Sequence, residues 1–194
     1  MGDGYKKYKP FERIDLPDRT WPDKTIDKAP IWCSVDLRDG NQALIDPMSQ
    51  EEKLLYFQSL VEVGFKEIEV GFPSANDTEF EICRALIKGG DIPEDVTIQV
   101  LVQAREHLIR KTFDAIRGAK NVILHFYSST STLQRTVVYE KDMVGSVKIA
   151  TAAVTLIRDQ SGGLDTGVAN LRFQSSPETV TCTAVQYAGR TRQS

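Results

Sequence analysis

The feature that most constrains the fold of this chain is an alternation that starts at residue 31. Short β-branched runs alternate there with segments of helical periodicity. The pattern predicts strands at 31–37, 65–72, 96–102, 121–128 and 168–174. It predicts helices at 50–64, 76–90, 105–118 and 139–159. Strict alternation of this kind is typical of a parallel sheet with helices outside it, which makes the chain an α/β protein.

Two architectures fit the alternation, an open doubly wound sheet and the first half of a TIM (β/α)8 barrel. Neither G-x-G-x-x-G nor G-x-x-x-x-G-K-[ST] follows the first strand, which removes two common reasons for an open sheet. Barrels keep their chemistry at the carboxyl ends of the strands, although open sheets share that rule. Polar residues gather along these strands and at their ends: Asp36, Arg38, Asp39, Glu67, Glu69, His125, Ser176 and Glu178. This placement favours the incomplete barrel, with about five strands.

The chain divides by composition into three parts. Residues 1–30 hold four prolines and read as an extended N-terminal arm, in which Trp21 is either an anchor or an exposed aromatic residue. Residues 31–178 form the predicted half-barrel. Residues 179–194 form a tail.

Charge and composition exclude several classes of function. Lys and Arg number 24 against 27 Asp and Glu, a net charge of −3, which argues against nucleic acid as a partner. No apolar run approaches the roughly 20 residues needed to cross a membrane. Three scattered cysteines predict neither a disulfide framework nor a metal site. The first residues lack the apolar core of a secretory signal, so we expect a cytoplasmic protein, or a mitochondrial one in a fungus.

Arg38 and Asp39 follow the first strand directly, and Glu69 lies in the next one. Strand side chains alternate, so Arg38 and Asp39 diverge unless the chain turns at Gly40. With such a turn, Asp39 would face a cation while Glu69 holds the Arg38 guanidinium toward a ligand oxyanion. A purely structural ion pair explains the same residues.

Each of the other polar residues has a structural explanation beside a functional one. His125 lies in an apolar strand, where a histidine is commonly a satisfied core residue. Ser176 before Pro177 is typical of a helix N-cap. The run 128–132 reads as a solvated polar loop, although it could cradle an anion, and His107 reads as a surface residue.

Four segments, in order, carry a resemblance to a known family. They are WCSVDLRDGNQALIDPMS at 32–49, KEIEVGFPSANDTEF at 66–80, QVLVQARE at 99–106 and HFYSSTSTLQRTV at 125–137. Together they resemble the 2-isopropylmalate synthase family, in its fungal and actinobacterial branch. The resemblance spans about residues 8–178. The wider superfamily consists of TIM barrels named for an Asp-Arg-Glu triad, whose positions are occupied here by Asp39, Arg38 and Glu69.

The resemblance implies a Claisen-type condensation of acetyl-CoA with 2-oxoisovalerate, giving 2-isopropylmalate and CoA in leucine synthesis. It also implies a homodimer and a divalent cation, with Mg²⁺ first and Zn²⁺ or Mn²⁺ as alternatives. Asp39 would ligate the metal, and Arg38 would hold the keto oxygen with Glu69 fixing it. The other implied roles are carboxylate binding by His125 and Ser176, a pocket for the isopropyl group at Leu101 and Tyr127, and support of acid–base chemistry by Glu178.

The sequence also departs from the family pattern. It lacks the HxH metal motif and the GxGERxGN loop, and its tail diverges after residue 178. We therefore expect a fragment that binds metal poorly, shows no synthase activity alone and self-associates through open sheet edges. Two alternatives stay open, a homocitrate or citramalate synthase and an inactive fragment that associates with a full-length synthase.

Overall fold

The structure is a computed structural model that describes residues 28–163 and 167–178. The chain divides into two units, Met1–Pro30 and Ile31–Ser194, and almost all of the described residues belong to the second. Trp21, most of the predicted arm and the predicted tail lie outside the described residues.

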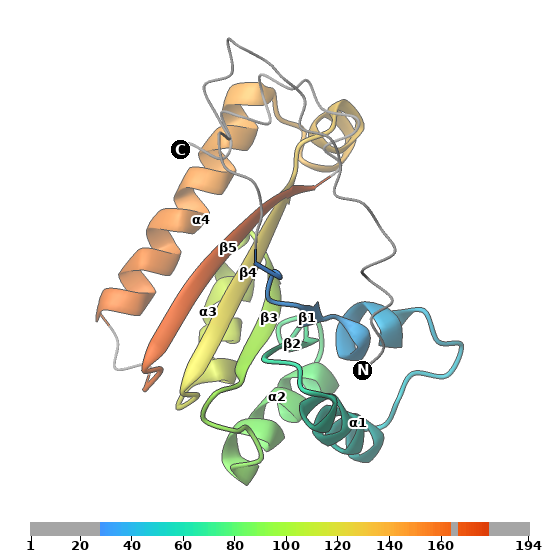
Figure 1. Ribbon diagram of the computed structural model, residues 1–194. Helices are drawn as coiled ribbons and strands as arrows, with labels where there is room; N and C mark the ends of the chain where they lie inside the picture. The colour runs from blue at the N-terminus through green and yellow to red at the C-terminus, as the bar shows by residue number, and fades with distance from the viewer. Residues whose placement is uncertain (1–27, 164–166, 179–194) are drawn as a thin grey trace. The chain divides into compact units, whose positions relative to one another are not determined.

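The second unit is built on a parallel sheet whose strands follow one another in chain order (Figure 1). The strands are β1 (Cys33–Ser34), β2 (Glu67–Gly71), β3 (Thr97–Gln103), β4 (Asn121–Ser129) and β5 (Asn170–Glu178). The helices are α1 (Gln50–Val63), α2 (Asp77–Gly89), α3 (Glu106–Ile116) and α4 (Met143–Gly163). Each neighbouring pair of strands is parallel, and consecutive helices pack against each other. The predicted α/β class is confirmed, and the sheet is consistent with an incomplete barrel.

The two faces of the sheet differ in chemistry because strand side chains alternate. One face is aliphatic and packs under the helices: Ile68, Val70, Ile98, Val100, Val102, Val122, Leu124 and Phe126 are all buried. The other face is the inner one, and it carries most of the polar strand residues. These include Glu67, Glu69, Gln99, His125, Arg172 and Ser176, placed on one face by the strand register.

Helix ends follow the capping rules. Ser49 and Glu52 form a reciprocal capping box at the start of α1, and the Asn76 side chain accepts from the Glu79 N–H at the start of α2. Gly64 ends α1 with φ of 107°, a left-handed conformation that favours glycine. Helix α3 packs one face into the core, where Ile109, Phe113 and Ile116 are buried.

The first strand is much shorter than the predicted 31–37. Only Cys33 and Ser34 pair with β2, and Asp36–Gly40 form a π-helical turn, η2. The Ser34 hydroxyl donates to the Asp36 carboxylate at 2.6 Å, and the N–H groups of Arg38 and Gly40 both donate to the Val35 carbonyl. These local bonds lead the chain out of the sheet at Val35.

Two further expectations are corrected. The helix predicted at 139–159 begins at Met143 and runs to Gly163, after a π-helical turn, η3 (Gln134–Val138). The run 128–132 is not a solvated loop, because Ser128 and Ser129 belong to β4 and every residue from 128 to 131 is buried. His107 is exposed, as predicted. In the part of the chain that the structure describes, no helix is both long and apolar enough to cross a membrane.

Candidate active site

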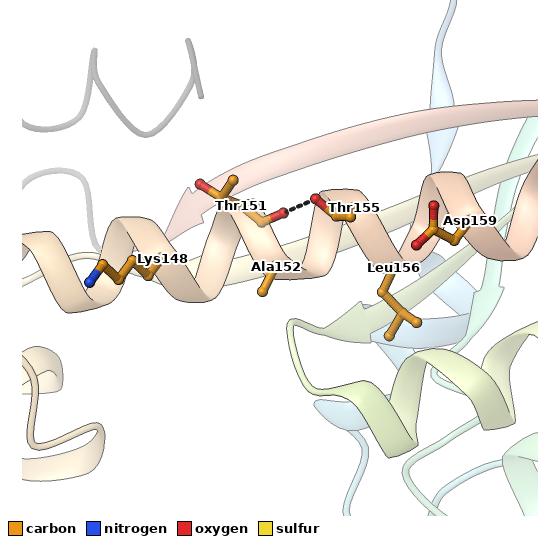
Figure 2. Close-up of a pocket in the computed structure, with 6 residues that line it drawn as sticks. All are labelled: Lys148, Thr151, Ala152, Thr155, Leu156 and Asp159. Carbon is orange, nitrogen blue, oxygen red and sulfur yellow. Dashed lines mark hydrogen bonds between the residues drawn. The ribbon is translucent and has the colours of Figure 1, made fainter.

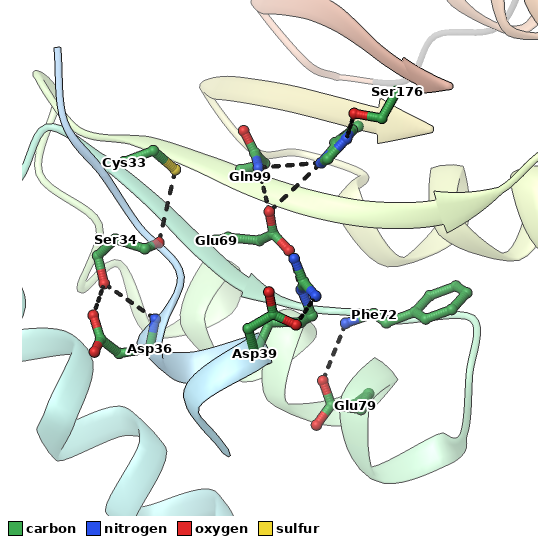
Figure 3. Close-up of polar contacts among 11 residues, drawn as sticks. Cys33, Ser34, Asp36, Asp39, Glu69, Phe72, Glu79, Gln99 and Ser176 are labelled. Atoms are coloured by element: carbon green, nitrogen blue, oxygen red, sulfur yellow. Dashed lines mark hydrogen bonds and ion pairs between the residues drawn. The ribbon is translucent and has the colours of Figure 1, made fainter. Parts of the chain in front are cut away.

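Several polar side chains of the inner face form a connected group around Glu69 (Figure 3). The Glu69 side chain is 1% exposed, and its Oε1 accepts from Nε of Arg38. Its Oε2 accepts from Nε2 of Gln99 and lies 3.7 Å from Nδ1 of His125. Arg38 comes from η2, whereas Glu69, Gln99 and His125 come from β2, β3 and β4. Four elements therefore meet at one carboxylate.

The group continues from His125 to the last strand. Nε2 of His125 lies 2.7 Å from the Ser176 hydroxyl, and Nδ1 lies 3.5 Å from Nε2 of Gln99. Ser176 was predicted as a possible helix cap, and that interpretation is wrong, because Ser176 and Pro177 lie within β5. Pro177 is compatible with this position because β5 is the last strand of the sheet, where a missing N–H is tolerated.

Electrostatics keep the Glu69 carboxyl ionised. Burial by itself raises the pKa of Glu69, but the interactions with His125, Arg38 and Gln99 outweigh burial and hold the pKa below its usual value. The Arg38 side chain is 14% exposed, so its positive charge is largely removed from water and faces Glu69 directly. An anionic ligand that met the remaining guanidinium donors would find a fixed, poorly hydrated cation.

Asp39 lies beside Arg38 rather than apart from it. The guanidinium of Arg38 donates to Oδ1 of Asp39, and the Asp39 side chain is 56% exposed. The turn η2 produces this contact, because both residues leave the sheet on one helical turn instead of alternating along a strand. A turn at Gly40 was the condition for bringing the two side chains together, and the turn that does so begins at Asp36.

The remaining predicted site residues lie on the same inner face. Leu101 is buried and pairs in register with His125, and Tyr127 pairs with Ser176. The rings of Tyr127 and Phe72 meet edge to face, with centroids 6.4 Å apart. Burial, with a smaller contribution from the Glu178 charge, raises the pKa of Tyr127. Glu178 is the last residue of β5 and is exposed, and its carbonyl accepts from the Thr130 N–H.

Sequence reasoning missed two residues of this site. Gln99 connects Glu69 to His125, and its signal was a single amide inside the apolar run TIQVLV. Phe72 contributes its ring to the wall beside Tyr127, and nothing in its own sequence context marks it.

The described residues do not by themselves fit a divalent metal. Among them, no three His, Cys, Asp or Glu side chains converge on one point. Asp39 offers a single carboxylate that already accepts from Arg38. Burial first, and the charges of Glu69 and Glu67 next, raise the pKa of the Cys33 thiol to about 11.

A hollow of about 500 Å³ lies elsewhere, along the outside of α4 (Figure 2). Its lining is Lys148, Thr151, Ala152, Thr155, Leu156 and Asp159, and the Thr155 hydroxyl donates within the helix to the Thr151 carbonyl. None of the polar residues around Glu69 contributes to it. The convergence of polar groups therefore places the candidate site on the inner face of the sheet.

Comparison with known proteins identifies the family of this chain. The model of the HMGL-like family matches residues 29–191. The chain belongs to the HMGL-like family. It is 61% identical over 186 residues to a 2-isopropylmalate synthase of Corynebacterium glutamicum, covering 94% of this chain and 30% of that protein. It is 55% identical over 188 residues to the 2-isopropylmalate synthase of Mesorhizobium japonicum, covering 97% of this chain and 33% of that protein.

A third relative, the 2-isopropylmalate synthase of Brucella suis, is 56% identical over 182 residues. The resemblance expected from the four sequence segments is thereby confirmed. The chain spans about a third of the length of these curated relatives. Condensing enzymes of the HMGL-like family generally use a divalent metal.

Proposed function

We propose that this chain supplies the 2-oxo acid binding part of a 2-isopropylmalate synthase. The whole site would condense acetyl-CoA with 2-oxoisovalerate and release 2-isopropylmalate and CoA. The observation that carries the proposal is the continuous polar group Arg38–Glu69–His125–Ser176 on the inner face of a parallel sheet. The names of the relatives support the choice of this reaction.

Arg38 is the proposed partner of the keto oxygen. In the condensation, an acetyl-CoA enolate attacks the keto carbon, and negative charge develops on the keto oxygen. A guanidinium has five N–H donors, of which Glu69 and Asp39 engage Nε and one terminal nitrogen. The remaining donors can meet the oxyanion, and because Glu69 already fixes the guanidinium, little reorganisation accompanies the reaction.

His125 and Ser176 are proposed to bind the carboxylate of the 2-oxo acid, which would accept from both side chains in place of the bond that they make with each other at 2.7 Å. Leu101 and Tyr127 would contact the isopropyl group from the same face. Glu178, at the end of β5, would support the acid–base chemistry.

Asp39 would be one metal ligand, with the other ligands from outside the described residues. Mg²⁺ is the first choice, and Zn²⁺ or Mn²⁺ the alternatives. We further propose a cytoplasmic homodimer, with neither nucleic acid nor membrane as a partner.

The substrate is tested by restoring the missing part of the barrel. Residues 8–178 of this chain would replace the corresponding segment of the Corynebacterium glutamicum relative, and CoA release would be measured with three 2-oxo acids. We expect turnover with 2-oxoisovalerate and little with pyruvate or 2-oxoglutarate. Preference for pyruvate would indicate a citramalate synthase, and preference for 2-oxoglutarate a homocitrate synthase. Either outcome would contradict the proposal.

The role of Arg38 is tested in the same chimera. Arg38→Gln should lower kcat/KM by roughly 10²–10³-fold, since a charged donor to the oxyanion is lost. Arg110→Gln is the matched control, because Arg110 forms an exposed ion pair with Glu106 at 2.8 Å and lies on α3. Equal losses in the two variants would show that Arg38 has no special role.

A further inference from the structure

A second polar contact crosses the inner face of the sheet. It lies nearer the amino ends of the strands than the candidate site does. NH2 of Arg172, on β5, lies 2.5 Å from Oε1 of Glu67, on β2. These strands are not neighbours, because β3 and β4 lie between them. Side chains stand roughly perpendicular to a sheet. Two side chains three strand spacings apart can therefore meet only if the sheet curls, so that its inner face becomes concave. The ion pair is therefore direct evidence of curl.

Its position relative to the site follows from the strand period of two. Glu67 is two residues before Glu69 on β2, and Arg172 is four residues before Ser176 on β5. Both pairs share the inner face. Two polar connections thus run from β2 toward β5. The ion pair lies nearer the amino ends of the strands, and the Glu69–His125–Ser176 chain lies nearer their carboxyl ends.

The Glu69–His125–Ser176 chain is sensitive to the curl of the sheet. His125 and Ser176 lie on neighbouring strands, so the hydrogen-bonded ladder between β4 and β5 fixes their separation. Glu69 and His125 are two strands apart, and 3.7 Å separates Oε2 from Nδ1. Flattening the sheet would widen this gap without breaking any backbone pairing.

We propose that Glu67 and Arg172 are positioning residues, whose ion pair keeps the sheet curled so that the Glu69 carboxylate faces the His125 imidazole. The inference rests on the proposed function only in naming a 2-oxo acid as the ligand of the positioned groups. The pair is partly exposed, with side-chain exposures of 56% for Arg172 and 14% for Glu67. Arg172 is thus solvated while Glu67 is largely removed from water, so the free energy of unfolding of each variant is measured beside its spectra to separate position from stability.

The chain offers its own reporter, because its two histidines are His107 and His125. His107 is exposed on α3 and far along the chain from the pair, whereas His125 lies in the site. In imidazole NMR spectra of the full chain, Arg172→Met should move the His125 resonances and leave those of His107 in place. Arg172→Lys, which keeps the charge, should restore the His125 resonances at least in part.

Arg117→Met is the matched control. Arg117 has a similar exposure of 55% and pairs with Asp114 at 3.0 Å, but within a surface helix region. It should move neither histidine. Glu67→Gln breaks the same ion pair from the other side at nearly constant side-chain size, so it should reproduce the His125 change of Arg172→Met. His125 resonances that coincide with the wild type in both Arg172→Met and Glu67→Gln would overturn the inference.

Titration with 2-oxoisovalerate separates this inference from the proposed function. We expect binding to the wild-type chain to weaken by about threefold to tenfold in Arg172→Met and to stay unchanged in Arg117→Met. If the wild type does not bind 2-oxoisovalerate while Arg172→Met still moves His125, the proposed function fails and the positioning role stands. If Arg172→Met binds as well as the wild type, the positioning role fails.

Discussion

Glu69 is the residue on which the candidate site depends. A carboxylate that is 1% exposed would be costly to bury if it lacked partners. Here Arg38 and Gln99 each donate to one of its oxygens, and His125 lies beside the second. Removing one member leaves the others buried with an unmet charge or donor. The site is therefore a unit, and single substitutions in it should act through their neighbours.

Because the pKa of Glu69 is lowered, the contribution of Glu69 to the free energy of unfolding depends on pH. A carboxyl whose pKa is depressed by folding stabilises the fold above its unfolded pKa, and the stabilisation is lost as the pH falls through the folded pKa. Glu69→Gln should therefore lower the free energy of unfolding by about 3 kcal/mol near neutral pH. The difference from the wild type should shrink in acid, where Glu69 is protonated in both states.

Denaturant unfolding of both proteins near neutral pH and at about pH 3 measures this difference. Glu52, Glu94 and Asp95 also have lowered pKa values, but they are present in both proteins and cancel in the comparison. A difference that stays constant over this range would mean that the ionisation of Glu69 contributes nothing to stability.

At the residue scale, the sequence predicted the charged partners better than their geometry. Arg38 and Glu69 were expected to pair, and they do. The contact between Arg38 and Asp39 was not expected, because a strand was predicted through residue 37. The Ser34 hydroxyl accepts from the Asp36 N–H and donates to the Asp36 carboxylate, and these local bonds end that strand. Such local bonds are invisible to a periodicity argument.

Between elements, a buried ion pair fixes the loop that follows β2. Lys53 of α1 is 2% exposed and pairs with Oε1 of Glu79 on α2. The other Glu79 oxygen accepts from the Phe72 N–H at 3.1 Å, directly after β2 (Figure 3). Phe72 in turn contacts Tyr127. Two outer helices therefore position a loop that forms one wall of the candidate site.

Lys53→Met should lower the free energy of unfolding by about 3–5 kcal/mol, because Glu79 would lose its only ion-pair partner among the described residues. Adding Glu79→Gln should recover part of that loss. The matched control is Lys111→Met, since Lys111 pairs with the almost fully exposed Asp77 and should have little effect. Chemical denaturation of the four proteins measures these differences. A loss for Lys53→Met no greater than that for Lys111→Met would contradict the buried-pair interpretation.

Two glycines in different elements should respond to alanine in opposite directions. A Cβ at Gly71 would lie 2.2 Å from the Glu79 carboxylate oxygen, which Lys53 and Phe72 hold in place. A Cβ at Gly162, in α4, would meet nothing within 4 Å. Gly71→Ala should therefore lower the thermal midpoint of unfolding. Gly162→Ala should raise it, by a stabilisation of about 0.4–1 kcal/mol. A Gly71→Ala protein as stable as the wild type would show that Glu79 moves freely.

At the element scale, helix ends were predictable because caps are local: Asn76 begins and Gly64 ends the helices that were predicted at 76–90 and 50–64. The partner of Lys53 was not predictable. Within helix 50–64 a lysine is expected on the solvent side, and only the packing of α1 against α2 buries it beside Glu79. Tertiary packing decides such positions, and helical periodicity does not contain that information.

For the whole molecule, the sheet has two unequal edges. β1 pairs over two residues, whereas β5 pairs with β4 over nine. In the part of the chain that the structure describes, no strand pairs with the other side of β5. The outward residues of β2 to β4 are buried under helices, but Phe173, an outward residue of β5, is 45% exposed. An extended strand with open backbone groups and an uncovered aromatic ring is a template for pairing.

We therefore expect the 194-residue chain to self-associate through β5. Sedimentation velocity should show a concentration-dependent shift to larger species. Phe173→Lys should reduce the shift by placing a charge on this edge. Leu55→Lys is the matched control, because Leu55 is 66% exposed on α1, away from the sheet edge. A stable monomer at micromolar concentration would contradict the edge argument. If the two lysine variants reduce the shift equally, association is caused by exposed apolar side chains in general and not by the edge of β5.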